Sequence, residues 1–144
     1  MSLWDHLRRL TKALTPPVPL SARAEAERKL DEFRAESLRY RAIVSYATDR
    51  AILFAPEEMP HVRDRNLGAS YGLTELYCCF VFETDADMAF AQEHKLTDWL
   101  EDRTRHELVL TGVPEHIAER FRATCTSHED IVRKTGGDYR IYFT

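Results

Sequence analysis

The chain has 144 residues, of which 44% are hydrophobic and 31% are charged, and it contains five glycines and six prolines. This balance excludes the disordered and collagen-like classes, and the length suits one domain with a single core. The net charge is −4, and no apolar run approaches the roughly 20 residues that a membrane-spanning helix needs, so we expect a soluble, cytoplasmic protein without a membrane span.

Residues 1–38 are predicted to form a helical hairpin at the start of a single domain that spans residues 1–144. Leucines that recur at spacings of four, three and four residues predict an amphipathic helix over residues 2–14. These leucines are Leu3, Leu7, Leu10 and Leu14. A second helix is predicted over residues 21–37, where Ser21 suits the N-cap. The leucine stripe also makes the first helix the expected contact of a homo-oligomer.

Residues 40–54 are compatible with two secondary structures. The second helix has a stripe of mostly apolar positions spaced by four and three residues, and this period continues into the ambiguous segment. The stripe is formed by Ala26, Leu30, Phe33, Ser37, Tyr40, Val44, Ala47 and Ala51. Its continuation favours one helix, whereas β-branched and aromatic residues in segments 43–46 and 51–54 favour strands. We prefer a β-hairpin that turns at residues 48–50, followed by a surface loop over residues 56–72.

Residues 39–144 are predicted to form the sheet-containing core of the domain. Its clearest strand is Leu76–Phe82, a short apolar and aromatic run bounded by polar residues, which predicts a central strand buried on both faces. Thr84 and Asp87 then match a capping box for a helix, or for a pair of short helices, that ends near Arg103.

The remaining elements are predicted to alternate between strand and helix. They are a strand over residues 107–111, a helix from Pro114 with its apolar face reaching Cys125, a helix between a Ser127–Asp130 capping box and Gly136–Gly137, and a strand over residues 139–144. The whole order predicts an α+β fold: a small mixed or antiparallel sheet of about five strands, with helices on one face, preceded by the N-terminal helical hairpin.

The segment of residues 83–102 is strongly acidic, with seven acidic residues against one lysine. Such a surface suits a basic protein partner, because complementary charge speeds association and rejects wrong partners. The leading hypothesis is a non-catalytic protein-binding or regulatory module, for example an acidic inhibitor of the antitoxin or immunity type. The sequence has no basic stripe of the kind that predicts a nucleic-acid partner. The candidate partner-binding residues are Arg63, Arg65, Tyr71, Glu83, Asp85, Asp87, Glu93, Asp98, Glu101 and Asp102.

A second hypothesis assigns part of this acidic segment to a metal ion. Glu83, Asp85 and Asp87 follow the clearest strand, where open α/β sheets tend to place ligands, and alternating carboxylates can bind a divalent cation. With His94 as a base, they would make the chain a small metal-dependent hydrolase or phosphoesterase. The structural alternative is that Asp85 and Asp87 only stabilise the first turn of a helix.

Other motifs give no support for catalysis. Residues 68–72 match the Gly-x-Ser-x-Gly pattern, but a strand rather than a helix is predicted to follow them. The three cysteines form no Cys-x-x-Cys pair, and the six histidines lack metal-ligand spacing. No phosphate-binding loop is present. We therefore expect no cofactor and no catalytic residue, and an enzyme is the less favoured interpretation.

Overall fold

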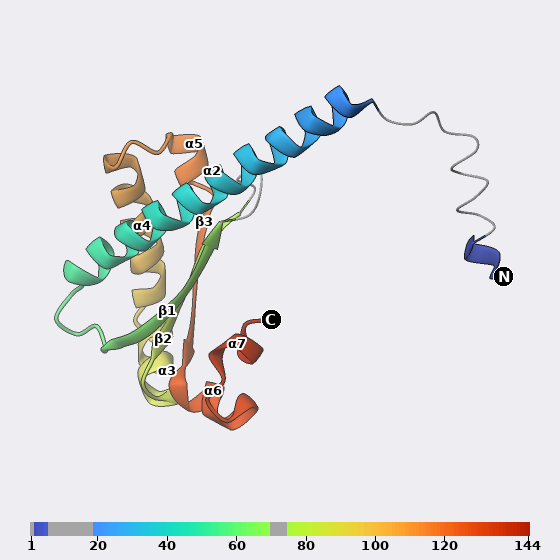
Figure 1. The fold of residues 1–144 in the computed structure, drawn as a ribbon. Coiled ribbons are helices and arrows are strands. Elements are labelled where there is room, and N and C mark those ends of the chain that lie inside the picture. Colours follow the sequence, from blue (N-terminus) through green and yellow to red (C-terminus); the bar gives the residue numbers. More distant parts are fainter. Residues whose placement is uncertain (1, 6–18, 70–74) are drawn as a thin grey trace. The chain divides into compact units, whose positions relative to one another are not determined.

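The computed structural model describes residues 2–5, 19–69 and 75–144 (Figure 1). The chain divides into two compact units, residues 1–34 and residues 35–144. The elements are α2 (Leu20–Leu53), β1 (Val62–Ala69), β2 (Leu76–Phe82), α3 (Asp85–Glu93), α4 (Leu96–Leu110), α5 (Glu115–Ala118), β3 (Phe121–Ser127), α6 (His128–Thr135) and α7 (Tyr139–Tyr142). Within the described residues, no helix is both long and apolar enough to cross a bilayer. The expectation of a single domain stays a prediction.

The α+β class is confirmed, but the sheet has three strands among the described residues and not about five. The strand order is β1-β2-β3, with β1 antiparallel and β3 parallel to β2. The strand Leu76–Phe82 was predicted with the bounds and the central position that the structure gives it. The sheet is therefore mixed, and β1 and β3 form its two edges.

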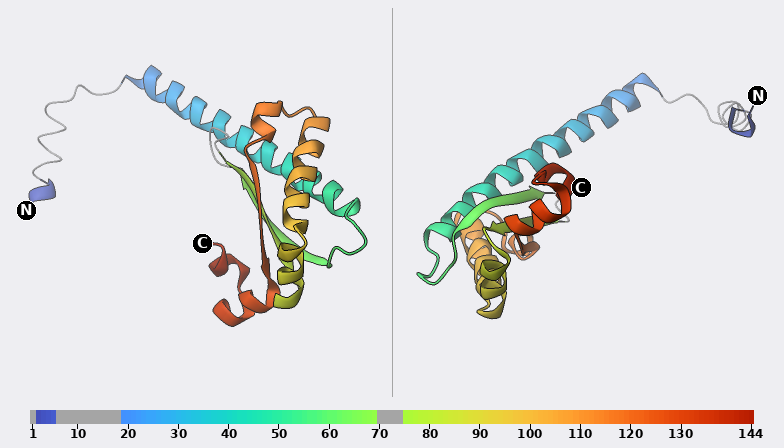
Figure 2. Two further views of the ribbon diagram at one scale, coloured as in Figure 1. Left: turned by 180° about the vertical axis from the view of Figure 1, so that it is seen from behind. Right: turned by 90° about the horizontal axis from the view of Figure 1, so that it is seen from below.

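The core lies against one face of β2. Leu76, Cys78, Phe80 and Phe82 alternate along the strand and are all at most 1% exposed. They pack with buried residues of α2, α3 and α4 in one cluster. On the opposite face, Val81 is fully buried but Tyr77 is 41% exposed, so the predicted burial on both faces holds only toward the end of the strand. Figures 1 and 2 show α3 and α4 on one side of the sheet and α6 and α7 on the other, so helices cover both faces rather than one.

The predicted hairpin over residues 40–54 is wrong, because α2 continues to Leu53. The stripe residues Tyr40, Val44, Ala47 and Ala51 are all buried, so the helical period was the pattern that tertiary packing used. Thr48 lies where the turn was expected. Its hydroxyl donates to the Val44 carbonyl at 2.9 Å, so this buried polar group is hydrogen-bonded inside the helix. Burial of this stripe outweighed the local strand preference of the segment.

The N-terminal hairpin is tested in part. The second helix does not end near residue 38 but crosses into the sheet-containing unit. Of the predicted first helix, residues 3–5 are helical, and Leu7, Leu10 and Leu14 lie outside the described residues. The predicted contact of a homo-oligomer through this leucine stripe is untested.

The predicted loop over residues 56–72 is wrong where it contains β1. This strand lacks an apolar alternation because its polar side chains find partners elsewhere in the chain. Arg63 pairs with Glu83 at 2.8 Å, and Arg65 pairs with Asp49 of α2 at 2.9 Å. An edge strand that is held by such long-range pairs gives no period-two signal in the sequence.

Three elements of the last 40 residues were assigned to the wrong class. Residues 107–111 end α4, where Glu107 is 4% exposed by its side chain and pairs with Arg103 one helical turn earlier. Residues 121–127 form β3, not the continuation of a helix from Pro114, which ends at Ala118. Residues 139–142 form α7, because Asp138 caps the Ile141 amide at 3.0 Å. In each case, contacts outside the segment or at its cap outweighed the local apolar pattern.

The predicted helix ends are confirmed at three places, whereas Ser21, the predicted N-cap of the second helix, lies inside α2, which begins at Leu20. The Thr84 hydroxyl accepts from the Asp87 amide, and the Ser127 hydroxyl accepts from the Asp130 amide, both at 3.0 Å. Gly136 ends α6 with φ of +69°, a conformation that glycine adopts without strain. The predicted pair of helices after Thr84 is also present, but α4 ends at Leu110 and not near Arg103.

Candidate functional site

The parallel pairing of β2 and β3 brings two helix N-termini together. Phe82 and Ser127 are paired in register, so the strands end side by side. Thr84 then starts α3 and Ser127 starts α6. The carboxyl ends of parallel strands are where α/β sheets commonly bind ligands, and exposed amides at helix N-termini attract anions. This end of the sheet therefore combines two features that ligand sites commonly have.

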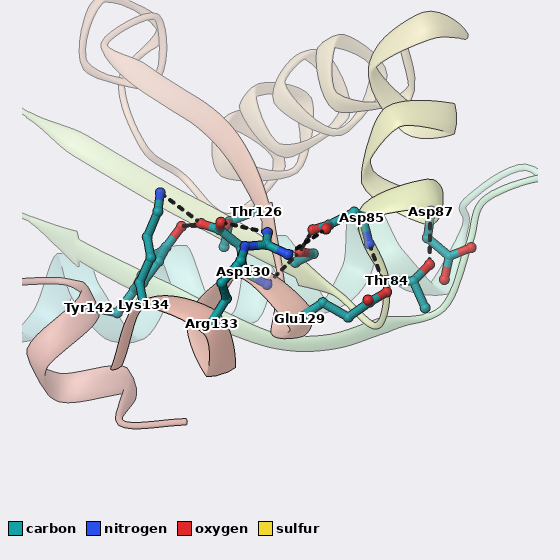
Figure 3. Close-up of polar contacts among 10 residues, drawn as sticks. Thr84, Asp85, Asp87, Thr126, Glu129, Asp130, Arg133, Lys134 and Tyr142 are labelled. Atoms are coloured by element: carbon teal, nitrogen blue, oxygen red, sulfur yellow. Dashed lines mark hydrogen bonds and ion pairs between the residues drawn. The ribbon is translucent and has the colours of Figure 1, made fainter. Parts of the chain in front are cut away.

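Carboxylate side chains of the chain itself occupy these helix N-termini. Asp85 of α3 accepts from the Ser127 hydroxyl and from Arg133 Nη1, the latter at 3.0 Å, and the Asp85 amide donates to Glu129 Oε1 at 3.1 Å. Figure 3 shows Asp85 of α3 close to Glu129 and Arg133 of α6. We name the Asp85, Ser127, Asp130, Arg133 and Tyr142 side chains the strand-end cluster.

Asp130 is the most heavily bonded acid of the strand-end cluster. Its Oδ1 accepts from Arg133 Nη2 at 2.9 Å, and its Oδ2 accepts from the Tyr142 hydroxyl at 2.6 Å and lies 3.1 Å from Lys134 Nζ. The Tyr142 hydroxyl also lies 2.6 Å from Thr126 Oγ1 of β3. Asp130 therefore ties α6 to α7, and through Tyr142 to the sheet.

Both aspartates of the strand-end cluster are held in the charged form. The Tyr142 hydrogen bond, followed by those of Arg133 and Lys134, lowers the pKa of Asp130 to about 2. The hydrogen bonds of Arg133 and Ser127 lower the pKa of Asp85. A hydrogen-bonded and neutralised carboxylate has little left to offer an incoming ligand. The strand-end cluster is thus organised as a structural joint.

The residues named for a metal site do not come together. Glu83 pairs with Arg63 at 2.8 Å, Asp85 pairs with Arg133, and the ring of His94 lies 4.1 Å from that of Phe90 between centroids. Among residues 2–5, 19–69 and 75–144, no group of three or more His, Cys, Asp or Glu side chains is arranged to hold a metal ion. The arrangement gives the metal hypothesis no geometric support.

The two arginines named for partner binding are engaged within the fold. Arg63 pairs with Glu83, and Arg65, whose side chain is 22% exposed, donates from Nη1 to the Ser45 carbonyl and the Thr48 hydroxyl at 2.9 and 2.6 Å. Arg65 therefore fixes β1 to α2. Tyr71 lies outside the described residues.

The acids of α4 differ from those of the strand-end cluster. Asp98 and Asp102 are exposed and lie one helical turn apart, and the Asp102 side chain is 79% exposed with Arg105 at 3.7 Å. Glu93, at the end of α3, is exposed and forms no ion pair with another described residue. These three carboxylates are thus exposed, and the chain does not neutralise them closely.

Glu101 and Arg105 of α4 cover part of the outer edge of β3. Glu101 Oε2 accepts from the Ala123 amide at 2.8 Å, and Arg105 donates to the Phe121 carbonyl at 2.8 and 3.1 Å. Glu101 and Arg105 also pair with each other at 2.8 Å. Side chains thus replace a fourth strand at the beginning of β3, which protects that edge.

Beyond Ala123 the edge of β3 borders a groove. In a parallel ladder, alternate residues direct their amide and carbonyl groups to the same side, so Cys125 faces the outer edge as Ala123 does. The Thr97 hydroxyl donates to Cys125 Sγ at 3.3 Å. The groove has a volume of about 300 Å³ and is lined by Gln92, Lys95, Thr97, Asp98, Ala123, Thr124 and Cys125. We name it the β3 groove, and it is the candidate site.

Of the residues named from the sequence, Asp98 lines the β3 groove, and Glu101 and Asp102 lie on the helix beside it. Sequence reasoning missed the contribution of β3, since this segment was assigned to a helix. A signal was present, because Phe121-Arg-Ala-Thr-Cys-Thr alternates apolar or small residues with polar ones. No sequence pattern marked Lys95 and Gln92 as groove residues, because the turn between α3 and α4 brings them to the groove.

Comparisons with protein-family models, curated proteins and solved structures find no significant match to the chain. The interpretation of the β3 groove therefore rests on its geometry and charge.

Proposed function

We propose that the chain is a non-catalytic protein-binding module that takes an extended, basic segment of a partner protein into the β3 groove. The observation that carries the proposal is the open stretch of the β3 edge at Cys125, which lies next to the groove lined by the exposed carboxylate of Asp98. An edge strand that is free in this way can pair with an added strand, and main-chain hydrogen bonds then supply affinity.

The upstream half of β3 limits the length of the added segment. Because Arg105 occupies the Phe121 carbonyl and Glu101 occupies the Ala123 amide, pairing can begin only past Ala123. The partner would therefore contribute a short strand whose side chains alternate between the groove and solvent. Thr97 and Gln92 of the groove offer a hydroxyl and an amide to that segment.

Charge determines which segment fits. Asp98 borders the groove, Asp102 lies one helical turn further along α4, and Lys95 is the one basic residue of the lining. Complementary charge raises the association rate and is screened by salt. An acidic inhibitor of a basic partner, of the antitoxin or immunity kind, would use such a surface, and we propose this role as the more specific form of the function.

A selection from a displayed library of random eight-residue peptides tests the proposal. Binders should be enriched in lysine and arginine, and their affinity should fall as the salt concentration rises. Asp98→Asn/Asp102→Asn should weaken binding by about tenfold, because each lost charge pair at a partly exposed site contributes up to ~1 kcal/mol. Binders without basic enrichment, or binders unaffected by this variant, would contradict the proposal.

Amide hydrogen exchange locates the binding mode. A bound basic peptide should slow exchange at the Cys125 amide, which would enter a new ladder. Cys125→Pro should abolish binding and spare the sheet, since the amide it removes points away from β2 and proline is tolerated at such edge positions. Cys125→Ala is the matched control, and thermal unfolding of both variants separates lost binding from lost folding. Protection confined to another surface would overturn the assignment of the β3 groove.

A further inference from the structure

A second groove lies on the face of the sheet that carries α7. It has a volume of about 340 Å³ and is lined by Asp64, Arg65, Asn66, Tyr139, Arg140 and Phe143. One wall is therefore the strand β1 and the other is the short helix α7. Figures 1 and 2 show α7 on the side of the sheet opposite to α3 and α4. We name this cavity the α7 groove, and it is separate from the β3 groove.

The β1 wall offers two polar side chains to the α7 groove. The register pairs Asp64 with Val81 of β2, so Asp64 and Asn66, two residues later, point to the face opposite the core. Arg65 points to the other face, where its guanidinium donates to Thr48 of α2. Asn66 is half-buried, and its side-chain amide forms no hydrogen bond with a described residue. One Asp64 oxygen accepts from the Arg65 amide at 2.7 Å, and the other accepts from no described residue.

The α7 wall offers two aromatic rings that are already held in place. The rings of Tyr139 and Phe143 lie 6.4 Å apart between centroids. The Tyr139 hydroxyl lies 2.8 Å from His128 Nδ1, and Tyr142 joins α7 to the strand-end cluster. A wall that is fixed before a ligand arrives loses little conformational entropy on binding.

The two walls carry opposite charges that do not meet. Asp64 on β1 and Arg140 on α7 are both exposed, and neither forms an ion pair with a described residue. The remaining charged residue of the lining, Arg65, is already paired with Asp49 at 2.9 Å. A purely anionic ligand would lie beside the like charge of Asp64, and a purely cationic ligand beside that of Arg140, which weakens binding. The α7 groove therefore favours a ligand that carries both charges.

We propose that the α7 groove binds a free aromatic α-amino acid. The ligand carboxylate would pair with Arg140 and its ammonium group with Asp64, which neutralises both walls. The ligand ring would pack against Phe143 and Tyr139, since aromatic pairs are favourable at centroid distances of about 4.5–7 Å. The Asn66 amide would donate to the ligand carboxylate. This site is distinct from the protein-binding function proposed for the β3 groove.

A chemical-shift titration of the ¹⁵N-labelled full chain with L-phenylalanine tests the proposal. The side-chain amide signals of Asn66 and the backbone amide of Arg140 should shift with a common dissociation constant. L-Alanine keeps both charges but lacks the ring, and should bind about tenfold more weakly or less tightly still. No shift at these signals at millimolar phenylalanine, or tighter binding of adenosine monophosphate than of phenylalanine, would overturn the proposal.

Two truncated ligands test which residue meets which charge. Phenethylamine lacks the carboxylate and 3-phenylpropionate lacks the ammonium group, so each should bind the parent chain about fivefold more weakly than phenylalanine. Arg140→Gln should remove the advantage of phenylalanine over phenethylamine, and Asp64→Asn its advantage over 3-phenylpropionate, because the counter-charge is gone. An advantage that persists in the corresponding variant would contradict the assigned contact.

Matched variants outside the α7 groove complete the test. Arg41→Gln, which changes an exposed arginine of α2, and Asp98→Asn, which changes the β3 groove, should leave the affinity for phenylalanine unchanged. Thermal unfolding of each variant shows whether the fold is retained. Because Asp98 belongs to the β3 groove, a failure of the peptide-binding proposal leaves this result unaffected. A loss of phenylalanine binding in Asp98→Asn or Arg41→Gln equal to that in Arg140→Gln would overturn the α7 groove as the site.

Discussion

Asp85 and Asp98 both belong to the acidic stretch that follows β2, but the fold treats them in opposite ways. Asp85 enters the strand-end cluster, where Arg133, 48 residues later in the chain, and Ser127 of β3 bind its two oxygens. Asp98 stays exposed at the border of the β3 groove. The comparison teaches that a run of acids in a sequence does not define an acidic surface. What defines it is the set of carboxylates that remain without a close cation after folding.

The largest expected effect is a loss of stability when one carboxylate of the strand-end cluster is neutralised, compared with the same change on the exposed face of α4. Asp130→Asn should lower the free energy of unfolding by about 1–3 kcal/mol, because hydrogen bonds to a charged group with three partners are weakened. Asp102→Asn, an identical chemical change at a site that is 79% exposed, should change it by less than about 0.5 kcal/mol. Urea denaturation of the two variants and the parent measures both values. Equal losses in the two variants would remove the distinction between the regions.

The second expected effect is a pH dependence that belongs to the strand-end cluster. The pKa of Asp130 is about 2 in the folded chain, against about 3.9 in an unfolded chain. Between these values the unfolded state binds more protons, so this stabilisation is fully present above about pH 4 and is lost as the pH falls toward about 2. Asp85, whose pKa is also lowered, acts in the same direction.

Urea midpoints measured over this pH range give the test. Asp130→Asn should flatten the acid limb of the stability curve, and the remaining slope should include the contribution of Asp85. An acid limb that is unchanged in Asp130→Asn would contradict the assignment of this pH dependence to the strand-end cluster.

The smallest expected effect concerns Glu101, which lies between the two kinds of acid. It is half-buried, pairs with Arg105 and caps the Ala123 amide at the edge of β3. Glu101→Ala should lower the free energy of unfolding by about 1 kcal/mol through the lost cap. Glu101→Gln should cost less, because its amide oxygen can still accept from Ala123. Thermal unfolding of the pair measures the difference, and equal losses would show that the ion pair, and not the cap, is the important contact.

The sequence predicted the parts of the candidate site that follow from composition. Asp98, Glu101 and Asp102 were named as partner-binding residues, and all three lie on α4 beside or near the β3 groove. The groove itself was not predicted, because it requires β3 and the turn at Lys95 to meet, and β3 was assigned to a helix. The named residues Arg63 and Arg65 were assigned to a surface role, but the fold uses both in contacts between its elements.

By itself, the sequence determined the features that depend on neighbours within a few residues. The caps at Thr84 and Ser127, the stop at Gly136 and the apolar run of β2 were all readable, because each is made by contacts inside its own segment. Only the tertiary structure decided that residues 40–53 are helical, that residues 62–69 form an edge strand, and which acids keep their charge exposed. The last two outcomes depend on partners 17 or more residues away, such as Thr48 for Arg65 and Arg133 for Asp85, and no local period records such pairs.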